Sequence, residues 1–334
     1  MNVQPLSCTI LDTRFLLEAI PEETASGLSL LLQGFRELAP NSHQFLRQVQ
    51  VSVTATPSPG PDHSEWTPNS PWVMELRGPG EWTVRIPLPG SFPDPREVEL
   101  ALIRQAMELS GDILVLHAAA LAREEESVLV VGESGAGKTT LSLLLRTRGW
   151  TLLSDDLAPF HIDDSRLLPF PRALHVDGEY PPEAVHGLFH PSRDFPPDYA
   201  PFPVPTDPPL VLAGAADLPK CLLYLTPRAD RGPGHEVGER GHGRGVNHPA
   251  ESEIHPLPGA EVAQILHRSV IRSRSLEVDR ALPFLIELGK GMRGFRVGGG
   301  SPGATLQNAL KALDLVPRHQ GRSSSGVLPT HDLF

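Results

Sequence analysis

Hydrophobic residues along this chain occur in short runs separated by proline-rich stretches, and the spacing within the runs predicts both strands and helices. In the first third, strands are expected at 48–54, 73–76 and 82–87. Residues 95–109 repeat apolar side chains at helical spacing and begin with Pro95, which favours the first turn of a helix. A small β-containing region is therefore expected over residues 1–109.

The longest apolar runs lie in the middle of the chain. Residues 113–122 are apolar except for His117 and predict one strand, and residues 128–131 predict the strand that pairs with it as a hairpin. An apolar run at 140–145 predicts a helix that ends at basic residues and Gly149. Later segments predict strands at 150–154, 220–226 and 294–297 and helices at 260–270, 276–288 and 301–313. This alternation favours an α/β fold.

Proline and glycine mark the boundaries between these regions. The chain holds 36 prolines and 30 glycines, and many of them gather in three stretches, 55–71, 181–209 and 227–250, that are typical of loops. The last residues, 317–334, are typical of a flexible tail. We therefore expect an N-terminal region at 1–109, a second domain at 110–316 and the tail.

Composition limits the partners and the location. The chain has 334 residues, of which 40% are hydrophobic, and its 29 lysines and arginines against 40 aspartates and glutamates give a net charge of −11. An acidic surface repels nucleic acid and anionic lipid, so neither is expected as a partner. Two cysteines, Cys8 and Cys221, are typical of reduced thiols in the cytosol, and no apolar run reaches membrane-spanning length. A cytoplasmic protein is predicted, and a homo-oligomer stays open.

One motif points directly to chemistry. Residues 132–139 read Gly-Glu-Ser-Gly-Ala-Gly-Lys-Thr, the form G-x-x-x-x-G-K-[ST] of a phosphate-binding loop, between a predicted strand and a predicted helix. Its glycines let backbone N–H groups surround an anion, and the helix presents its positive end to the same anion. Lys138 supplies a cation for the β- and γ-phosphates, and the Thr139 hydroxyl is placed to bind Mg²⁺. The alternative is a glycine-rich turn that binds nothing.

The loop is therefore predicted to bind ATP together with Mg²⁺. The residues expected to contact the nucleotide are Gly132, Glu133, Ser134, Gly135, Ala136, Gly137, Lys138, Thr139 and Thr140.

An acidic pair follows the loop. Asp155 and Asp156 end the strand predicted at 150–154, directly after the helix of the phosphate-binding loop. Phosphoryl transfer needs one carboxylate to orient the metal and another to accept the proton of the attacking hydroxyl. Such a pair is also typical of a polar strand end or a helix N-cap. Taken alone, the pair leaves a catalytic role and a structural role open.

The order of these pieces resembles the HPr kinase/phosphorylase family. That family has a Leu-His or Val-His strand, a hairpin, a GxSGxGKS-type loop, a helix and Leu-Val-x-Asp-Asp. The corresponding pieces here are Leu116-His117, residues 132–139 and Leu152-Leu153-Ser154-Asp155-Asp156. His117 lies 138 − 117 = 21 residues before Lys138, and Asp156 lies 156 − 138 = 18 residues after it, as in the family. The resemblance covers residues 110–160 well and the rest of the C-terminal half weakly.

The resemblance implies that residues 110–316 form an α/β kinase domain with a P-loop core of the HPr-kinase-like or PEP-carboxykinase-like type. It implies Asp156 as the catalytic base and His117 beside the transferred phosphate. Asp155 would assist the metal together with Thr139. The implied catalytic set is Asp156, Lys138, His117 and Asp155, with ATP as donor and Mg²⁺ as metal.

The chain departs from that family after the acidic pair. The family's Glu-x-Arg-Gly-x-Gly-Ile loop, whose glutamate completes the Mg²⁺ site, is replaced by Leu168-Pro169-Phe170-Pro171-Arg172-Ala173-Leu174-His175, in which only Arg172 corresponds. The chain is more similar to divergent HPr-kinase-related proteins, some of which phosphorylate a serine of a peptide in natural-product pathways. Guanidinium groups suit phosphate oxygens, and the arginines considered for neutralising transition-state charge are Arg172, Arg193, Arg272 and Arg274.

The expected function is an ATP- and Mg²⁺-dependent kinase that transfers the γ-phosphate to a serine hydroxyl on a peptide or small protein. Two alternatives stay open. One is a kinase of a small-molecule hydroxyl, and the other is a non-catalytic module that binds nucleotide for regulation.

Overall fold

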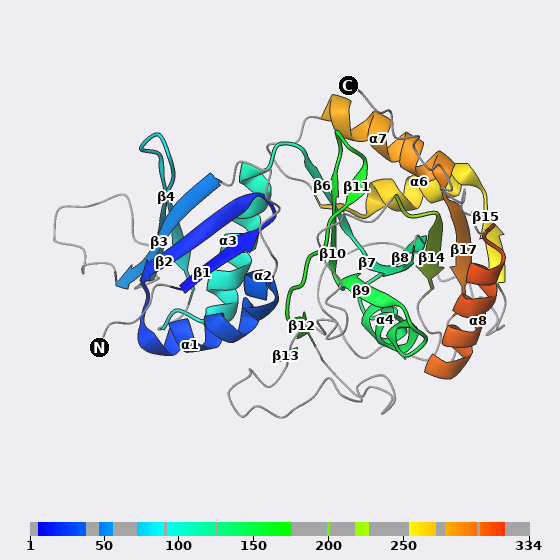
Figure 1. The fold of residues 1–334 in the computed structure, drawn as a ribbon, viewed down its shortest axis with the longest axis horizontal. Helices are drawn as coiled ribbons and strands as arrows, with labels where there is room; N and C mark the ends of the chain where they lie inside the picture. The colour runs from blue at the N-terminus through cyan, green and yellow to red at the C-terminus, as the bar shows by residue number, and fades with distance from the viewer. Residues whose placement is uncertain are drawn as a thin grey trace, which may run out of the picture.

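The computed structural model shows a mixed α/β fold with several sheets, which confirms the predicted class (Figure 1). The residues described are 6–37, 47–55, 72–89, 92–124, 126–175, 199–200, 218–226, 254–271, 278–298 and 301–317. Four predicted segments lie outside this set: the stretches 55–71, 181–209 and 227–250 and the tail 317–334. The exceptions are residue 55, residues 199–200 and residue 317, which the structure describes.

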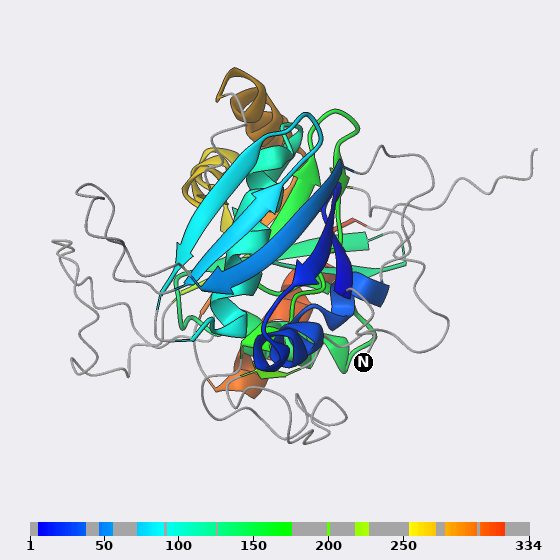
Figure 2. The ribbon, with the colours of Figure 1, turned by 90° about the vertical axis from the view of Figure 1, so that its left-hand side faces the viewer.

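The N-terminal region is a five-stranded sheet backed by helices (Figure 2). Its strands lie in chain order: β1 (Leu6–Ile10), β2 (Thr13–Ala19), β3 (Arg47–Ala55), β4 (Trp72–Arg77) and β5 (Thr83–Leu88). Neighbours pair antiparallel except β2 and β3, which are parallel. The helices are α1 (Glu22–Leu31), α2 (Gln33–Glu37) and α3 (Pro95–Leu109). The strands predicted at 48–54, 73–76 and 82–87 and the helix predicted at 95–109 are confirmed, whereas β1, β2, α1 and α2 were not predicted.

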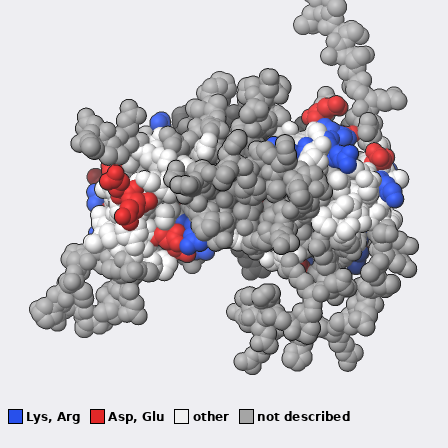
Figure 3. Space-filling view, turned by 90° about the horizontal axis from the view of Figure 1, so that it is seen from below, with Lys and Arg blue, Asp and Glu red and all other residues white. Residues whose placement is uncertain are grey.

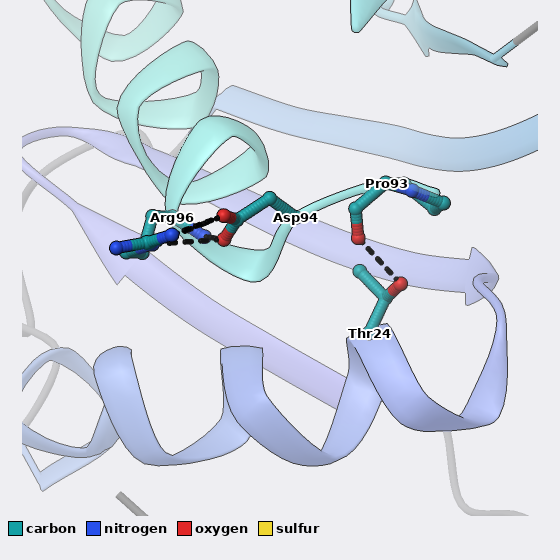
Figure 4. A network of polar contacts seen from close by, with 4 residues as sticks. All are labelled: Thr24, Pro93, Asp94 and Arg96. Atoms are coloured by element: carbon teal, nitrogen blue, oxygen red, sulfur yellow. Dashed lines mark hydrogen bonds and ion pairs between the residues drawn. The ribbon is translucent and has the colours of Figure 1, made fainter. Parts of the chain in front are cut away.

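Helix α3 begins where its sequence dictates (Figure 4). Asp94 is the N-cap, and its side chain accepts a hydrogen bond from the Arg96 backbone N–H at 2.9 Å, while Pro95 takes the first helical position. One residue earlier, the Pro93 carbonyl accepts a 2.8 Å hydrogen bond from the buried Thr24 hydroxyl of α1. The Thr24 hydrogen bond ties the start of α3 to α1, and the Asp94 cap defines the residue at which the helix begins.

The larger part of the fold is built on a six-stranded sheet. Its strand order is β15 (Ile254–Leu257), β17 (Arg293–Val297), β14 (Cys221–Leu225), β8 (Glu126–Gly132), β7 (Ala119–Arg123) and β9 (Thr151–Ser154). β17, β14 and β8 are parallel, and β7 is antiparallel to both β8 and β9. Helices α4 (Lys138–Arg146) and α8 (Pro302–Asp314) pack on one face, and α6 (Gly259–Arg268) and α7 (Val278–Gly291) pack on the other. The predicted hairpin of β7 with β8 is confirmed, as are the strands predicted at 150–154, 220–226 and 294–297 and the three C-terminal helices.

The prediction of one continuous strand at 113–122 is wrong, because the chain bends at Ala118 and the two halves of the run belong to different sheets. Its first half, β6 (Ile113–His117), belongs to a four-stranded sheet and its second half is β7. That sheet has the order β11 (Arg166–Leu167), β10 (Leu157–His161), β6 and β16 (Val270–Ile271). Both halves are buried, so hydropathy alone does not show the bend. A short pair, β12 (Leu174–His175) with β13 (Tyr199–Ala200), completes the described strands.

The N-terminal sheet and the rest of the fold share a core. Ile113 and Val115 of β6 and Phe170 belong to the same buried cluster as the N-terminal sheet and α3. On the face drawn in Figure 3, the described acidic and basic side chains are scattered in small groups, some of which hold both signs of charge. Among the described helices, none has both the length and the apolar character needed to cross a membrane.

Candidate functional site

The predicted site residues meet where two connections join the four-stranded sheet to the six-stranded sheet. One connection leads from β6 to β7, and the other leads from β9 to β10. β7 is antiparallel to β8 and to β9, so β8 and β9 run in the same direction and end at the same edge. His117 and Ala118 lie at that edge because they precede β7, and the Ala118 N–H donates to the Asp156 carbonyl at 3.2 Å. Asp155 and Asp156 link β9 of the six-stranded sheet to β10 of the four-stranded sheet. The topology therefore brings His117, the acidic pair and the glycine-rich loop together.

The glycine-rich loop, residues 132–139, turns through two glycines into the first turn of α4. Gly135 and Gly137 have φ values of 73° and 99°, in the left-handed region that favours glycine. Gly137 is the N-cap of α4, so free N–H groups of the first helical turn lie next to the loop. A side chain at Gly132 would come within 2.9 Å of the Leu225 carbonyl of β14, so this glycine allows close strand packing. The outer turn, residues 133–135, is exposed to solvent.

Gly137→Ala is expected to destabilise the fold by about 1–3 kcal/mol, because alanine strains at a φ of 99° even though its methyl group meets no atom within 4 Å. Nucleotide affinity should fall with it, since relief of the strain turns the loop N–H groups away. Thermal unfolding and nucleotide titration measure both effects. Gly303→Ala in α8 is the matched control: the added methyl group also meets open space, the backbone is ordinary, and unchanged or slightly raised stability is expected.

Lys138 folds back into the loop. Its side chain is buried, and Nζ donates to the carbonyls of Gly132 at 3.0 Å and Glu133 at 3.3 Å. Burial lowers the pKa of Lys138, while the charges of Asp156 and Asp155 act in the opposite direction. An ammonium group whose partners include neutral carbonyl oxygens can exchange one of them for a phosphate oxygen.

His117 contacts the same ammonium group, with its Nε2 3.3 Å from Lys138 Nζ. Burial lowers the pKa of His117, and the charge of Lys138 lowers it further, whereas the carboxylate and the backbone hydrogen bond of Asp156 raise it. The ring is therefore neutral at pH 7. Because an ammonium only donates, Nε2 is the acceptor and the ring proton resides on Nδ1. His117 thus holds the lysine without adding positive charge.

Asp155 is the most buried acidic group of the site, with 7% of its surface exposed. Its Oδ2 accepts a 2.9 Å hydrogen bond from the Thr139 hydroxyl, while its buried Oδ1 has no hydrogen-bond partner among the residues that the structure describes. Burial raises the pKa of Asp155 to about 7, and the charge of Asp156 adds to this, against smaller lowering effects of Thr139, Lys138 and Arg172. A buried carboxylate oxygen without a partner is costly unless a cation or a proton meets it.

The donor set fits Mg²⁺. The unpartnered Oδ1 of Asp155 lies on a carboxylate whose other oxygen already contacts Thr139, so both predicted metal ligands are adjacent. Within the described residues, no group of three or more histidine, cysteine or acidic side chains forms a metal cage. Mg²⁺ does not need such a cage, because proteins bind it through one or two carboxylates together with substrate phosphates and water.

One contact near the site was missed from the sequence. Arg172 does not point freely at the loop but forms an ion pair with Glu99 of α3, which sequence reasoning missed. The available signal was an acidic residue on the otherwise apolar face that Val98, Leu102 and Ala106 form at helical spacing. The other candidate arginines, Arg193, Arg272 and Arg274, lie outside the described residues.

Neither a comparison with protein-family models nor a search of curated proteins found a match to this chain.

Proposed function

We propose that this protein is an ATP- and Mg²⁺-dependent kinase that transfers the γ-phosphate to a serine hydroxyl on a peptide or small protein. The observation that carries the proposal is the 2.9 Å hydrogen bond between Thr139 of the glycine-rich loop and Asp155 of the acidic pair. A phosphate-binding loop on its own indicates nucleotide binding, but a carboxylate pair in contact with it indicates chemistry at the terminal phosphate. The arrangement supports a P-loop core of the HPr-kinase-like type.

Each residue has a role in this proposal. The N–H groups of the loop and the Lys138 ammonium bind the donor phosphates. Thr139 and the free oxygen of Asp155 would hold Mg²⁺, which when bound neutralises charge on the phosphates. Asp156, half-buried at the edge of the site, accepts the proton of the acceptor hydroxyl. The acceptor oxygen forms its bond to the γ-phosphorus as the bond to the β–γ bridging oxygen breaks, and ADP leaves.

The experiment that tests the proposal is transfer of label from γ-labelled ATP to two panels of acceptors. Serine-containing peptides and small proteins form one panel, and hydroxyl-bearing metabolites form the other. Label on a peptide serine supports the proposal, and label only on a metabolite supports the small-molecule alternative. Binding of ATP without transfer to any acceptor supports a regulatory module, which the replacement of the family's metal-binding glutamate loop by residues 168–175 favours.

Lys138→Ala is expected to weaken ATP binding about 10- to 100-fold, the effect of losing one charge-assisted contact. Isothermal titration with ATP and Mg²⁺ measures it. Lys290→Ala, which removes an exposed lysine paired with Glu287 on α7, is the control and should leave the affinity unchanged. Equal ATP affinity of the Lys138→Ala protein and the unaltered protein would exclude the loop as the nucleotide site.

A further inference from the structure

The segment that follows β11, residues 168–173, runs between α2 and β9 and is held by both parts of the fold (Figure 1). The Phe170 N–H donates to the Leu153 carbonyl at 2.8 Å, and Phe170 forms a parallel bridge with Ser154. The Phe170 side chain, in contrast, belongs to the buried cluster of the N-terminal sheet and α3. One residue therefore joins the backbone of β9 to the core of the N-terminal region.

The end of β9 depends on this outer contact. Among the described strands, β9 is at the edge of the six-stranded sheet and pairs there only with β7. That pairing is irregular where Ala120 lies opposite Ser154, because the register shifts between Ala120 and Leu121. Such an irregularity disrupts the ladder locally. The bridge to Phe170 therefore supports the residue directly before Asp155 on the side that β7 does not cover.

Helix α2 holds the same segment from the opposite side. The rings of Phe35 in α2 and Phe170 pack edge to face with their centroids 4.9 Å apart, and the two residues are only 1% and 2% exposed. A side chain at Gly34 of α2 would overlap the Pro171 carbonyl. Protein cores are close-packed and transmit displacements. A shift of α2 therefore moves the segment as well.

Small displacements at the end of β9 matter because of what Asp155 is proposed to bind. Its Oδ2 accepts the Thr139 hydroxyl hydrogen bond at 2.9 Å. Mg²⁺ requires nearly ideal octahedral geometry with short bonds to oxygen. A carboxylate that is displaced relative to Thr139 would therefore bind Mg²⁺ less tightly, whereas the phosphate contacts of the glycine-rich loop would not change.

We infer that the N-terminal region positions the metal-binding carboxylate: Phe170 is a positioning residue whose ring is held by α2 and whose backbone holds the end of β9, so that Asp155 stays against Thr139. This inference rests on the proposed function, because it requires Mg²⁺ and a nucleotide at the site. It gives the N-terminal region a part in metal binding without a direct contact to the metal.

Gly34→Ala tests the link, because its methyl group pushes the Pro171 carbonyl away. The Mg²⁺ concentration that half-saturates the Mg²⁺-dependent part of ATP binding should rise about 3- to 10-fold, with ATP affinity in the absence of Mg²⁺ nearly unchanged. Gly27→Ala in α1 is the matched control. Its methyl group would lie 2.7 Å from Pro95 of α3, which strains the N-terminal region away from residues 168–173. Calorimetric titration of ATP at a series of Mg²⁺ concentrations measures both variants.

Phe170→Ala should raise the Mg²⁺ requirement in the same way, and Phe170→Leu should restore most of the affinity because leucine still fills the space beside α2. Phe15→Ala is the control, since it removes a fully buried ring of β2 from the same cluster and should lower stability alone. In the metal-free protein, the backbone amides of residues 153–155 should exchange hydrogen faster in Gly34→Ala than in Gly27→Ala.

The outcomes separate this inference from the kinase proposal. If the unaltered protein does not bind ATP with Mg²⁺, both are overturned. If it binds them but transfers phosphate to no acceptor, the kinase proposal fails while the Mg²⁺ requirement still tests Phe170. Equal Mg²⁺ requirements of Gly34→Ala and Gly27→Ala overturn the positioning role. An equal loss of ATP affinity with and without Mg²⁺ overturns it too. If Phe170→Ala does not fold, the comparison of the two glycine variants still decides.

Discussion

Asp156→Asn is expected to reduce phosphate transfer about 10²- to 10⁴-fold, the usual contribution of a general base. Asparagine keeps the size of the side chain but cannot take up the acceptor proton at neutral pH. ATP affinity should change little, because the loop and Lys138 provide the phosphate contacts and the Asp156 carbonyl keeps its hydrogen bond to Ala118. Single-turnover transfer from labelled ATP, read together with an ATP titration, measures the two properties separately.

Asp163→Asn provides the control for that variant. Asp163 is exposed in the segment after β10 and pairs with Arg280, so the same chemical change there should leave transfer intact. If Asp156→Asn retained full transfer, Asp156 would have no part in the mechanism. Asp155 would then be the one member of the acidic pair with a proposed role, that of a metal ligand. If ATP binding were lost along with transfer, Asp156 would act in binding instead.

The two members of the acidic pair are suited to different tasks by their surroundings. Asp155 is buried with its pKa raised to about 7, whereas Asp156 lies half-buried beside His117 and Lys138. Neighbouring carboxylates in unlike environments commonly divide the work of one site. In the proposed reaction the buried Asp155 binds the metal cation, and the more accessible Asp156 accepts the proton of the acceptor hydroxyl.

The sequence was informative about the site where short-range patterns carry the chemistry. The loop motif predicts a strand, a tight turn and a helix, and the positions of His117 and Asp156 relative to Lys138 fit one edge of a sheet. The structure places His117 next to Lys138 and Asp155 next to Thr139. The hairpin of β7 and β8 follows from the apolar runs on each side of a polar turn, so it was predictable as well.

Other features depend on contacts between distant parts of the chain, which local patterns do not report. The bend at Ala118 lies inside a run that is apolar on both sides, because both halves are buried in different sheets. The pairing of Glu99 with Arg172 spans 73 residues. From the sequence alone, Glu99 is a single charged residue on the apolar face of α3, and amphipathic helices commonly contain such exceptions. Its ion-pair partner becomes known only from the structure.

Asp155→Asn is expected to have two opposite effects, the loss of phosphate transfer and a gain in thermal stability without metal. Burial raises the pKa of Asp155 from the ordinary 3.8 to about 7, so folding favours the protonated carboxyl. The stability that this group contributes is fully present below about pH 4 and is lost as the pH rises through 7, where the folded protein must bury a carboxylate. Asparagine removes that cost and still accepts the Thr139 hydroxyl hydrogen bond.

Thermal unfolding at pH 5 and pH 8, with and without Mg²⁺ and ATP, measures the effect. Without ligands, the melting temperature of Asp155→Asn should exceed that of the unaltered protein at pH 8, by about 2–4 °C for each kcal/mol relieved, and the difference should shrink toward pH 5. With Mg²⁺ and ATP the order should reverse, because only the carboxylate holds the metal and gains the stability that ligand binding confers. If Asp155→Asn were less stable than the unaltered protein at pH 8 without ligands, the Asp155 carboxylate would stabilise the fold by itself. It would then not be a group that needs a bound cation.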